Sequence, residues 1–278
     1  MPKSALQNES LDAEIGLLIE AIYNKYSYDF REYTFASQKR RVLQAVVSLK
    51  CGNVTALMNK VLQDPEMFMQ LLQYLTIPVS EMFRDPSYYA ALREHVIPIL
   101  KTYPSLKVWV AGCSTGEEIY SLAILLEEEG LLDKSIIYAT DINPVSLEKA
   151  KKGIFPINRM PLYTENYQRS GGKKSFSDYY TAAYDGAIFD QALSRNVTFA
   201  DHSLATDHIF SEVHLISCRN VMIYFNATLQ SRVLDLFHDS LCHKGFLGLG
   251  SKESLDYSTH VDKFIPLAKK DRLFRKSA

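Results

Sequence analysis

Two short segments of the sequence carry residues whose types and spacing suit the binding of a small ligand. The segment Gly112–Glu118 (GCSTGEE) lies between a β-branched and aromatic run and a helical pattern. Its glycines let the backbone approach a ligand closely, and free N–H groups at a helix N-terminus attract an anion such as a carboxylate or phosphate. Asp141 ends the next strand-like run, where an acidic residue holds the hydroxyls of an unphosphorylated ribose. Together these residues predict a ligand that contains adenosine.

The same residues also have purely structural interpretations. Thr115 and Glu118 stand at the spacing of a capping box, which satisfies two backbone amides without a ligand, and Asp141 alone could be an ordinary loop acid. The loop lacks the lysine of GxxxxGK[ST], which argues against a nucleoside triphosphate, and it does not match GxGxxG, which weakens a dinucleotide interpretation. Spacing alone does not name the ligand.

The composition is that of a globular protein and excludes several classes. The chain has 278 residues, of which 47 % are apolar and 23 % charged, enough for one large domain or for a medium domain with a smaller one. A disordered chain, a collagen-like chain and a disulfide-stapled mini-protein are therefore excluded. The 31 basic and 32 acidic side chains leave a formal charge of −1, so no overall field draws the chain to nucleic acid or anionic lipid.

Cysteine usage and hydropathy predict a soluble cytoplasmic protein without a metal site. The cysteines form no CxxC or cysteine–histidine pattern, so we expect reduced thiols at Cys51, Cys113, Cys218 and Cys242. The first ten residues contain no apolar signal-peptide core. No stretch approaches the roughly 18 uninterrupted apolar residues that a membrane span requires.

The first hundred residues are predicted to be helical. Apolar residues at helical spacing form one stripe on the first helix, namely Leu11, Ile15, Leu18, Ile19 and Ile22. A second helix is expected over 37–49. Two later helices are each predicted to begin with an acidic cap followed by proline, at Asp64-Pro65 and at Asp85-Pro86. Between them, Thr76–Ser80 is expected to be an extended linker.

From residue 106 the pattern alternates between strands and helices, which predicts a parallel sheet. The predicted strands are Leu106–Ala111, Ile136–Thr140, Val213–Ser217 and Phe246–Gly250, with helices over 117–129 and from Pro144. The last two runs, Phe264–Ala268 and Arg272–Lys276, suit an antiparallel pair.

A small hairpin is predicted inside this α/β region. Tyr179–Ala183 and Ala187–Gln191 flank the dipeptide Asp185-Gly186. This dipeptide favours a type I′ turn, which needs positive φ at both central residues.

Two motifs go further than their spacing. Ala111–Glu118 (AGCSTGEE) and Cys218–Phe225 (CRNVMIYF) resemble the two strongest motifs of the chemotaxis receptor methyltransferases, the CheR type, and Glu81–Asp85 (EMFRD) is similar to that family's linker motif. The resemblance covers nearly the whole chain. It implies an α/β fold, a Rossmann-like S-adenosylmethionine-dependent methyltransferase domain with a small inserted β-hairpin subdomain, preceded by an all-α N-terminal domain. The implied boundaries are 1–75 for the helical domain, 76–85 for a linker that contributes to the active site, and 86–278 for the methyltransferase domain, with the insertion at about 175–195.

The resemblance also implies an activity and a set of site residues. In that family a methyl group passes from S-adenosylmethionine to glutamate side chains of chemoreceptors, which leaves S-adenosylhomocysteine. Arg84 and Tyr224 match the residues that border the transferable methyl group, and these two are the implied catalytic residues. Glu118 and Asp141 would contact the amino-acid and ribose parts of the cofactor. The implied cofactor-binding positions are Pro78, Ser80, Arg84, Gly112, Glu118, Asp141, Ser203, Leu204, Arg219 and Asn220.

The chemistry agrees with these side-chain types. A glutamate carboxylate, with a reference pKa of about 4.3, is ionised at neutral pH and is itself the nucleophile. The protein therefore needs no general base, and its task is alignment and desolvation. Arginine can hold the carboxylate in a planar fork, and tyrosine can orient it through a hydrogen bond.

Three positions depart from the family's pattern and keep alternatives open. Pro78 stands where the linker usually carries Asn, Ser80 where it carries Thr, and Ser203 where Asn is usual. The first change removes an amide contact worth about 1 kcal/mol, so we expect weaker cofactor binding. One alternative is a non-catalytic adenosylmethionine-binding signalling module of the same fold. Another, a nicotinamide-dependent oxidoreductase, rests only on the general strand–helix pattern with its acidic residue.

The implied partners are the cytoplasmic helices of chemoreceptors. The basic cluster Lys39-Arg40-Arg41 lies on a predicted N-terminal helix and could steer toward helices that carry substrate glutamates. We expect no nucleic acid, no membrane insertion and a monomer. The tight turn at Asp185-Gly186 leaves little loop for a receptor-tail peptide to add as a strand.

Overall fold

The computed structural model describes residues 3–277, with side chains from residue 8 onward. The chain separates into two compact units. One contains the N-terminal residues through Ile77 together with Tyr224–Gln230, and the other contains Pro78–Ile223 and the residues from Ser231 onward. We describe each unit by itself.

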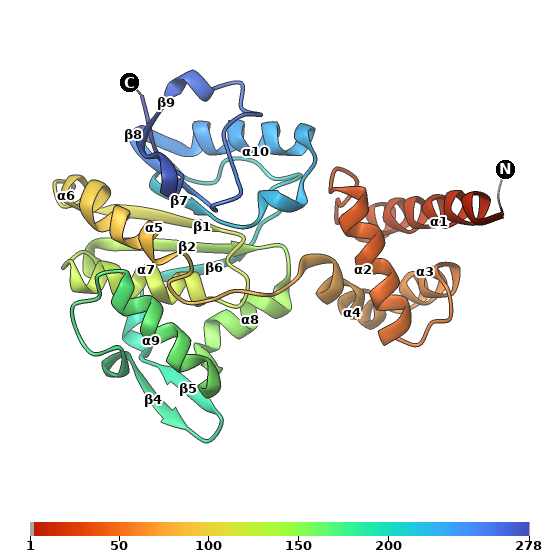
Figure 1. Cartoon of the computed structure of the whole chain (residues 1–278), viewed down its shortest axis with the longest axis horizontal. Helices are drawn as coiled ribbons and strands as arrows, with labels where there is room; N and C mark the ends of the chain where they lie inside the picture. Colours follow the sequence, from red (N-terminus) through yellow and green to blue (C-terminus); the bar gives the residue numbers. More distant parts are fainter. Residues whose placement is uncertain (1–2, 278) are drawn as a thin grey trace. The chain divides into compact units, whose positions relative to one another are not determined.

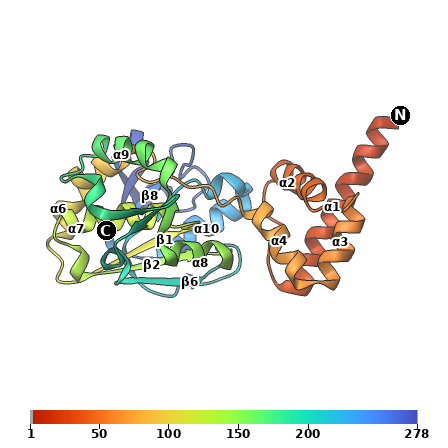
Figure 2. The same cartoon turned by 90° about the horizontal axis from the view of Figure 1, so that it is seen from below.

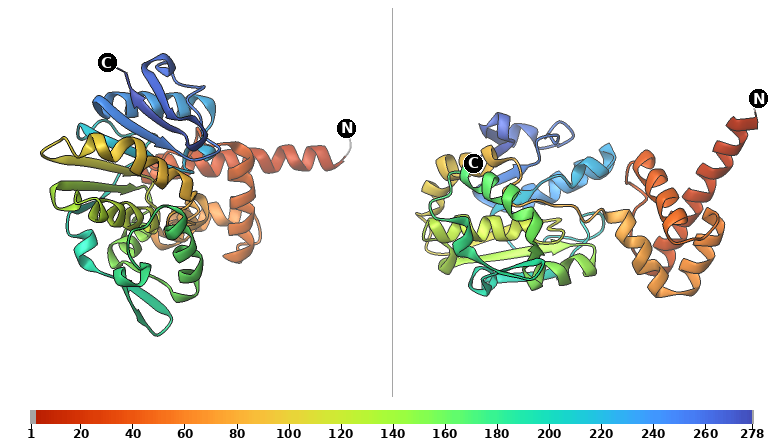
Figure 3. Two further views of the ribbon diagram at one scale, coloured as in Figure 1. Left: turned by 60° about the vertical axis from the view of Figure 1, so that its left-hand side comes forward. Right: turned by 60° about the horizontal axis from the view of Figure 1, so that its bottom comes forward.

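The first unit is helical, as the apolar spacing predicted. Its helices, seen in two views in Figure 3, are α1 (Lys3–Tyr26), α2 (Phe35–Ser48), α3 (Val54–Gln63) and α4 (Pro65–Thr76). Four members of the predicted stripe are buried: Ile15, Leu18, Ile19 and Ile22. Asp64 caps α4 as expected, because its carboxylate accepts a hydrogen bond from the Glu66 N–H at 2.9 Å.

The second unit contains a seven-stranded sheet in the order β6-β2-β1-β7-β8-β10-β9 (Figure 1). The strands are β1 (Leu106–Ala111), β2 (Ser135–Asp141), β6 (Val197–Asp201), β7 (Val213–Cys218), β8 (Leu241–Leu249), β9 (Phe264–Ala268) and β10 (Leu273–Lys276). Strands β6, β2, β1, β7 and β8 run parallel, and β10 pairs antiparallel with both β8 and β9. The predicted parallel sheet and the antiparallel terminal pair are confirmed.

Helices cover both faces of this sheet. Val108 and Val110 on one face of β1 belong to a core that includes Leu122 of α7 (Glu117–Glu128). Trp109 points to the other face, where its ring lies 5.4 Å from that of Phe237 on α10 (Ala227–Ser240). Because alternate residues of a strand point to opposite faces, this pattern requires a layer on each side. Figure 2 shows the layers from a second direction, including α8 (Pro144–Lys152).

The strand order reverses beside β1. The chain moves from β1 to β2 and β6 on one side and reaches β7 and β8 on the other. In open α/β sheets, ligands bind beyond the carboxyl ends of the strands where the order reverses in this way. The segments that follow β1, β2 and β7 are Gly112–Gly116, Asp141 and Arg219-Asn220, so the fold brings the predicted residues to one edge.

The predicted hairpin is present, but its turn differs from the prediction. Strands β4 (Tyr180–Ala183) and β5 (Gly186–Phe189) pair with Ala183 opposite Gly186, so the loop residues are Tyr184 and Asp185. Positive φ occurs at Tyr184 and at neither Asp185 nor Gly186, so the type I′ turn at Asp185-Gly186 is wrong. A short strand that the sequence did not reveal, β3 (Ile154–Pro156), completes a three-stranded sheet beside α9 (Met160–Arg169) (Figure 1).

A second correction concerns Asp85. Helix α5 (Pro86–Ala91) begins at the predicted proline and continues through a π-helical segment, Leu92–Val96, into α6 (Ile97–Leu100). The Asp85 side chain forms no capping hydrogen bond to the helix within the described chain. Its carboxylate binds Arg219 instead, so this residue belongs to the site rather than to the helix end. Among residues 3–277, no helix is both long enough and apolar enough to cross a membrane.

Candidate active site at the strand ends

The loop after β1 is shaped by two glycines. Gly112 has φ 74°, and a Cβ there would lie 2.5 Å from a methyl group of Val221. Gly116 has φ 100°, and a Cβ there would lie 2.9 Å from the Cα of Ala150 on α8. Since only glycine fits both the conformation and the contact, these residues fix the loop against its neighbours.

Asp141 faces this loop, as the ligand hypothesis required. Its Oδ2 accepts a hydrogen bond from the Ser114 N–H at 2.8 Å, and its Oδ1 accepts one from Asn143 at 2.9 Å. Burial raises the pKa of Asp141, and these backbone donors act against the rise. The Ser114 hydroxyl beside it is buried and has no hydrogen-bond partner in the described chain. The loop and the aspartate therefore form one polar corner.

Glu118 does not form the capping box that its spacing allowed. The Thr115 hydroxyl donates to Glu117 at 2.7 Å. The Glu118 carboxylate accepts a 2.6 Å hydrogen bond from Ser217 at the end of β7. Burial raises the pKa of Glu118, and the nearby Arg219 charge opposes this rise. The capping-box interpretation is wrong, and Glu118 instead belongs to the polar groups at the strand ends, beside Ser217 and Arg219.

Arg219 is the buried cation of the site, with a side chain that is 1 % exposed. Its Nη2 donates to the Arg84 carbonyl at 2.9 Å and to Asp85 at 2.7 Å, and its Nη1 lies 3.8 Å from Glu118. The guanidinium also lies 4.2 Å from the ring centroid of Tyr88. Arg219 Nε and Nη1 have no hydrogen-bond partner within residues 3–277. This residue thus ties the linker to the strand ends and keeps donors unused.

Glu253 is a site residue that the sequence analysis missed. It follows β8 and is 4 % exposed. Its carboxylate accepts hydrogen bonds from the N–H groups of Asn220 (3.0 Å), Val221 (2.8 Å) and Gly250 (2.6 Å). Asn220 adopts φ 62° and its amide Oδ1 has no partner in the described part of the chain. Glu253 therefore holds the loop after β7 in a conformation that presents the Asn220 amide.

The linker residue Arg84 is held between two residues with positive φ, Phe83 at 50° and Asp85 at 55°. Such conformations cost about 1–3 kcal/mol each for residues other than glycine. The Phe83 N–H donates to Ser121 at 2.9 Å, and its fully buried ring lies 5.0 Å from that of Tyr89. These contacts offset the strain and fix the backbone on both sides of Arg84.

Arg84 lines a cleft of about 380 Å³. The other lining residues are Val79, Ser80, Glu81, Asp85, Pro86, Arg159 and Asn166. Arg159 lies 3.7 Å from Glu81, which also accepts a 2.7 Å hydrogen bond from Asn166. Arg159 and Asn166 were not predicted, because they come from the segments around α9, far from the linker in sequence. The cleft thus combines two guanidinium-bearing residues, Arg84 and Arg159, with two carboxylates, of which Asp85 already pairs with Arg219.

The remaining predicted positions are placed as follows. Ser203 follows β6, its N–H donates to Asp207 at 2.8 Å, and its buried hydroxyl has no partner among the described residues. Leu204 is buried next to it in sequence. Ser80 lines the cleft, whereas Pro78 is not among the lining residues.

Tyr224 belongs to the first unit, with Phe225. The Arg41 guanidinium lies 4.6 Å from the Tyr224 ring centroid, and Arg41 also donates to the Leu75 carbonyl at 2.8 Å. Arg41 is 4 % exposed, so its predicted contact with a receptor is wrong. Lys39 pairs with Asp12 at 2.6 Å, and only Arg40 of the basic cluster is exposed.

The site fits an adenosyl cofactor with an amino-acid part. Its buried polar atoms without partners in residues 3–277 are Ser114 Oγ, Ser203 Oγ, Arg219 Nε and Nη1, and Asn220 Oδ1. Buried polar groups are costly unless a partner satisfies them, and these atoms lie in the segments that follow the ends of β1, β6 and β7. Together with the carboxylates of Asp141 and Glu118, they offer acceptors and donors for ribose, amine and carboxylate groups.

The fold and the site define a Rossmann-like S-adenosylmethionine-dependent methyltransferase with an all-α N-terminal domain. The chain belongs to the CheR methyltransferase family: residues 78–270 match the family's SAM-binding domain and residues 13–76 match its all-alpha domain. The family expected from the two motifs is confirmed. This match assigns the cofactor, so the nicotinamide alternative loses its support.

Two relatives and one solved structure illustrate the similarity. The chain is 65 % identical over 266 residues to Cher3 of Pseudomonas putida, covering 96 % of this chain and 97 % of that protein. It is 31 % identical over 229 residues to a chemotaxis protein methyltransferase of Listeria innocua, covering 82 % and 84 % respectively. The N-methyltransferase NodS from Bradyrhizobium japonicum, in complex with S-adenosyl-L-homocysteine, aligns with a TM-score of 0.41 and 13 % identity, covering 72 % of this chain and 90 % of NodS.

Proposed function

We propose that this protein transfers a methyl group from S-adenosylmethionine to glutamate side-chain carboxylates of chemoreceptors. The observation that carries the proposal is the cleft lined by both Arg84 and Arg159. A pair of guanidinium groups suits an anionic side chain, because arginine binds carboxylates through charge-assisted hydrogen bonds. Relatives such as the Listeria innocua protein are named chemotaxis protein methyltransferases, which supports receptors as the substrate class.

In this proposal the polar corner formed by Asp141 and the loop after β1 binds the cofactor. Asp141 would accept hydrogen bonds from the ribose hydroxyls in addition to the one from the Ser114 N–H, while Glu118 and Arg219 would contact the amino-acid part. Asn220 and Ser203 supply amide and hydroxyl groups that lack partners in the described chain. Gly112 would let the backbone approach the ligand, and Leu204 would contact its adenine part, as the motif match implies.

The chemistry asks little of the protein beyond alignment. Bound S-adenosylmethionine would supply a methyl group on a positively charged sulfonium centre, and the neutral thioether S-adenosylhomocysteine is the good leaving group. Arg84 would orient the substrate carboxylate toward the transferable methyl group, through hydrogen bonds from its guanidinium. Because this carboxylate is already ionised at neutral pH, no side chain has to remove a proton. Arg159 can exchange its Glu81 partner for the substrate, and Tyr224 is proposed, from the motif match alone, to orient the carboxylate through its hydroxyl.

The test is a methyl-transfer assay with labelled cofactor and receptor-containing membranes. We expect radioactivity in the receptor band that is released by mild base, as for a glutamate methyl ester. Arg84→Ala should lower turnover roughly hundredfold through lost alignment, whereas Arg169→Ala, an exposed arginine paired with Glu165 on α9, should not. Binding of S-adenosylhomocysteine without any base-labile product would contradict the proposal.

A second candidate is a non-catalytic adenosylmethionine-binding signalling module. The replacements at Pro78 and Ser203 favour it, because they remove amide contacts to the cofactor. Under this alternative, the protein binds one equivalent of cofactor and labels no receptor. Pro78→Asn then tests the cost of the departure: tighter binding of S-adenosylhomocysteine by calorimetry is expected, and unchanged affinity would contradict the role given to this position.

A further inference from the structure

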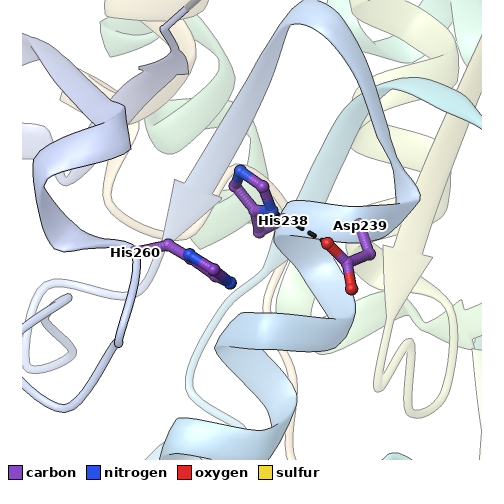
Figure 4. A group of neighbouring side chains, drawn as sticks. All are labelled: His238, Asp239 and His260. Atoms are coloured by element: carbon purple, nitrogen blue, oxygen red, sulfur yellow. Dashed lines mark hydrogen bonds and ion pairs between the residues drawn. The ribbon is translucent and has the colours of Figure 1, made fainter.

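Three potential metal ligands lie together at the C-terminal end of α10. They are His238 and Asp239 on the last turn of the helix and His260 in the segment before β9 (Figure 4). Strand β8 starts directly after α10, with Leu241 opposite Val213, the first residue of β7. The cluster therefore lies at the amino ends of these strands, at the edge opposite the methyltransferase site.

The ligand atoms are close enough to share one ion. One nitrogen from each imidazole and one Asp239 oxygen all lie within 4.8 Å of one another. The His238 Nδ1 lies 2.9 Å from Asp239 Oδ1, and the two rings stack with centroids 4.2 Å apart. Ligands of a tetrahedral zinc ion stand about 2.0–2.2 Å from the metal, hence roughly 3.3 Å from each other. Side-chain rotations that turn the two stacked rings toward one point would bring the ligand atoms to that spacing.

Asp235 adds a second carboxylate one turn earlier on α10. Its Oδ1 lies 3.8 Å from His260 Nε2 and accepts a 2.8 Å hydrogen bond from the Thr259 hydroxyl. Carboxylates in this position orient metal-binding histidines or serve as a further ligand. Asp235 thus ties the residue before His260 to the helix and lies close enough to serve either role.

The segment that carries His260 is held in place by its own hydrogen bonds. The His260 N–H donates to Ser258 at 3.0 Å, and the Lys263 N–H donates to the His260 carbonyl at 2.9 Å. The Lys276 ammonium group donates hydrogen bonds to the carbonyls of His238 and Leu241 at 2.7 and 2.9 Å. The Lys276 charge is therefore bound to the backbone at the C-terminal end of α10. Side chains of His238 and His260 are 13 % and 25 % exposed, which leaves them reachable from solvent.

We propose that His238, Asp239 and His260 bind one divalent transition-metal ion of the zinc class, supported by Asp235. Two imidazoles with a carboxylate suit Zn²⁺ better than Mg²⁺ or Ca²⁺, which prefer all-oxygen ligands. The ion fastens the segment before β9 to α10 and so secures the antiparallel edge of the sheet. It takes no part in methyl transfer. Because its ligands come from an adjacent pair and from a residue in a separate segment, no metal-ligand spacing revealed the site in the sequence.

The test uses the full chain, stripped with a chelator and titrated with Zn²⁺ against a chromogenic competitor. We expect one equivalent to bind and to raise the thermal midpoint. His260→Ala and Asp239→Asn should each weaken binding by roughly tenfold or more. His95→Ala, a partly exposed histidine outside the cluster, is the matched control and should bind as the parent does. Burial raises the pKa of the Cys113, Cys218 and Cys242 thiols, so these compete poorly for the ion.

Two outcomes would overturn the proposal. One is the absence of stoichiometric Zn²⁺ binding by the parent chain. The other is binding that neither substitution weakens, which would place the ion elsewhere. Asp239→Asn guards against misfolding as an explanation, since this side chain is 57 % exposed. Substitution with Co²⁺ gives an independent readout, because ligation by imidazole and carboxylate in a tetrahedral site produces visible absorption that His260→Ala should remove.

Discussion

Replacing Glu253 by glutamine removes the charge of a buried carboxylate while preserving its size. Glu253 Oε2 accepts hydrogen bonds from Gly250 and Asn220, and Oε1 accepts one from Val221. Burial raises the pKa of Glu253, and these backbone N–H donors act in the opposite direction. The side chain therefore stays in place because three donors surround it, and a neutral amide cannot satisfy all three.

The magnitude follows from the count of lost bonds. If the glutamine oxygen takes the place of Oε2, the bond from Val221 is lost, and if it takes the place of Oε1, two bonds are lost. Hydrogen bonds to a charged acceptor contribute about 1.5–3 kcal/mol each, and the new NH₂ group would also face an N–H donor. We expect Glu253→Gln to lower the free energy of unfolding by about 2–5 kcal/mol. Binding of S-adenosylhomocysteine should weaken as well, because the Asn220 amide loses its support.

Urea unfolding and calorimetric titration measure the two effects. The control is Glu212→Gln, an exposed glutamate just before β7, which should stay within about 0.5 kcal/mol of the parent. A Glu253→Gln protein that unfolds at the parent's urea midpoint and binds S-adenosylhomocysteine equally well would refute the role given to this carboxylate.

Three further substitutions test other parts of the structure. Asp141→Ala should weaken S-adenosylhomocysteine binding about 10- to 100-fold by calorimetry, the equivalent of one hydrogen bond to a charged group. An unchanged affinity would contradict the ribose contact. Gly116→Ala should lower the free energy of unfolding in urea by about 2–4 kcal/mol, because of the positive φ and the close contact with Ala150. The control is Gly130→Ala, which has φ 69° and no described atom within 4 Å of the added Cβ. It should lower the free energy of unfolding by only about 1 kcal/mol. Burial alone would raise the pKa of Glu129, but hydrogen bonds from Lys173, Lys101 and Arg93 lower it to about 2. Because its pKa is lower in the folded state, ionised Glu129 stabilises the fold above about pH 4.5, and this stabilisation is lost as the pH falls toward 2. The free energy of unfolding of Glu129→Gln should therefore fall less than that of the parent between about pH 5 and about pH 3. The same pH profile for both proteins would contradict the lowered pKa of Glu129.

Local patterns were sufficient to predict most elements. The stripe from Ile15 to Ile22, the cap at Asp64 and the strand Leu106–Ala111 each depend on neighbouring residues, so periodicity and capping chemistry identify them. The sequence also placed the loop at Gly112 and the acid at Asp141 on the same edge, because parallel strands end together. Errors arose where the outcome depended on a distant partner. Asp85 has the residue type and proline of a cap, but its carboxylate pairs with Arg219, more than a hundred residues away in the chain.

The same reasoning explains why Glu253 and Arg159 were missed. Neither lies in a motif that names its role, and each acts through a loop that only the tertiary fold brings near. Glu118 was identified from the sequence, but its contact was not. Its spacing from Thr115 fits a capping box, yet the hydroxyl of Ser217 on a different strand decides where the carboxylate lies. Sequence spacing therefore identified the functional segments more reliably than it identified the contacts within them.

The backbone adds an independent reason to regard these segments as functional. Ser114, Phe83, Asp85 and Asn220 all adopt positive φ although none is glycine. Such strain persists only where surrounding contacts enforce it, and it tends to accumulate at functional sites. Each of these residues is fixed by a hydrogen bond. Asp141 accepts from the Ser114 N–H, Ser121 from the Phe83 N–H and Glu253 from the Asn220 N–H, while Arg219 donates to the Asp85 carboxylate. Two of the four enforcing groups are themselves proposed cofactor contacts, so loss of either should both relax a strained loop and remove a ligand contact.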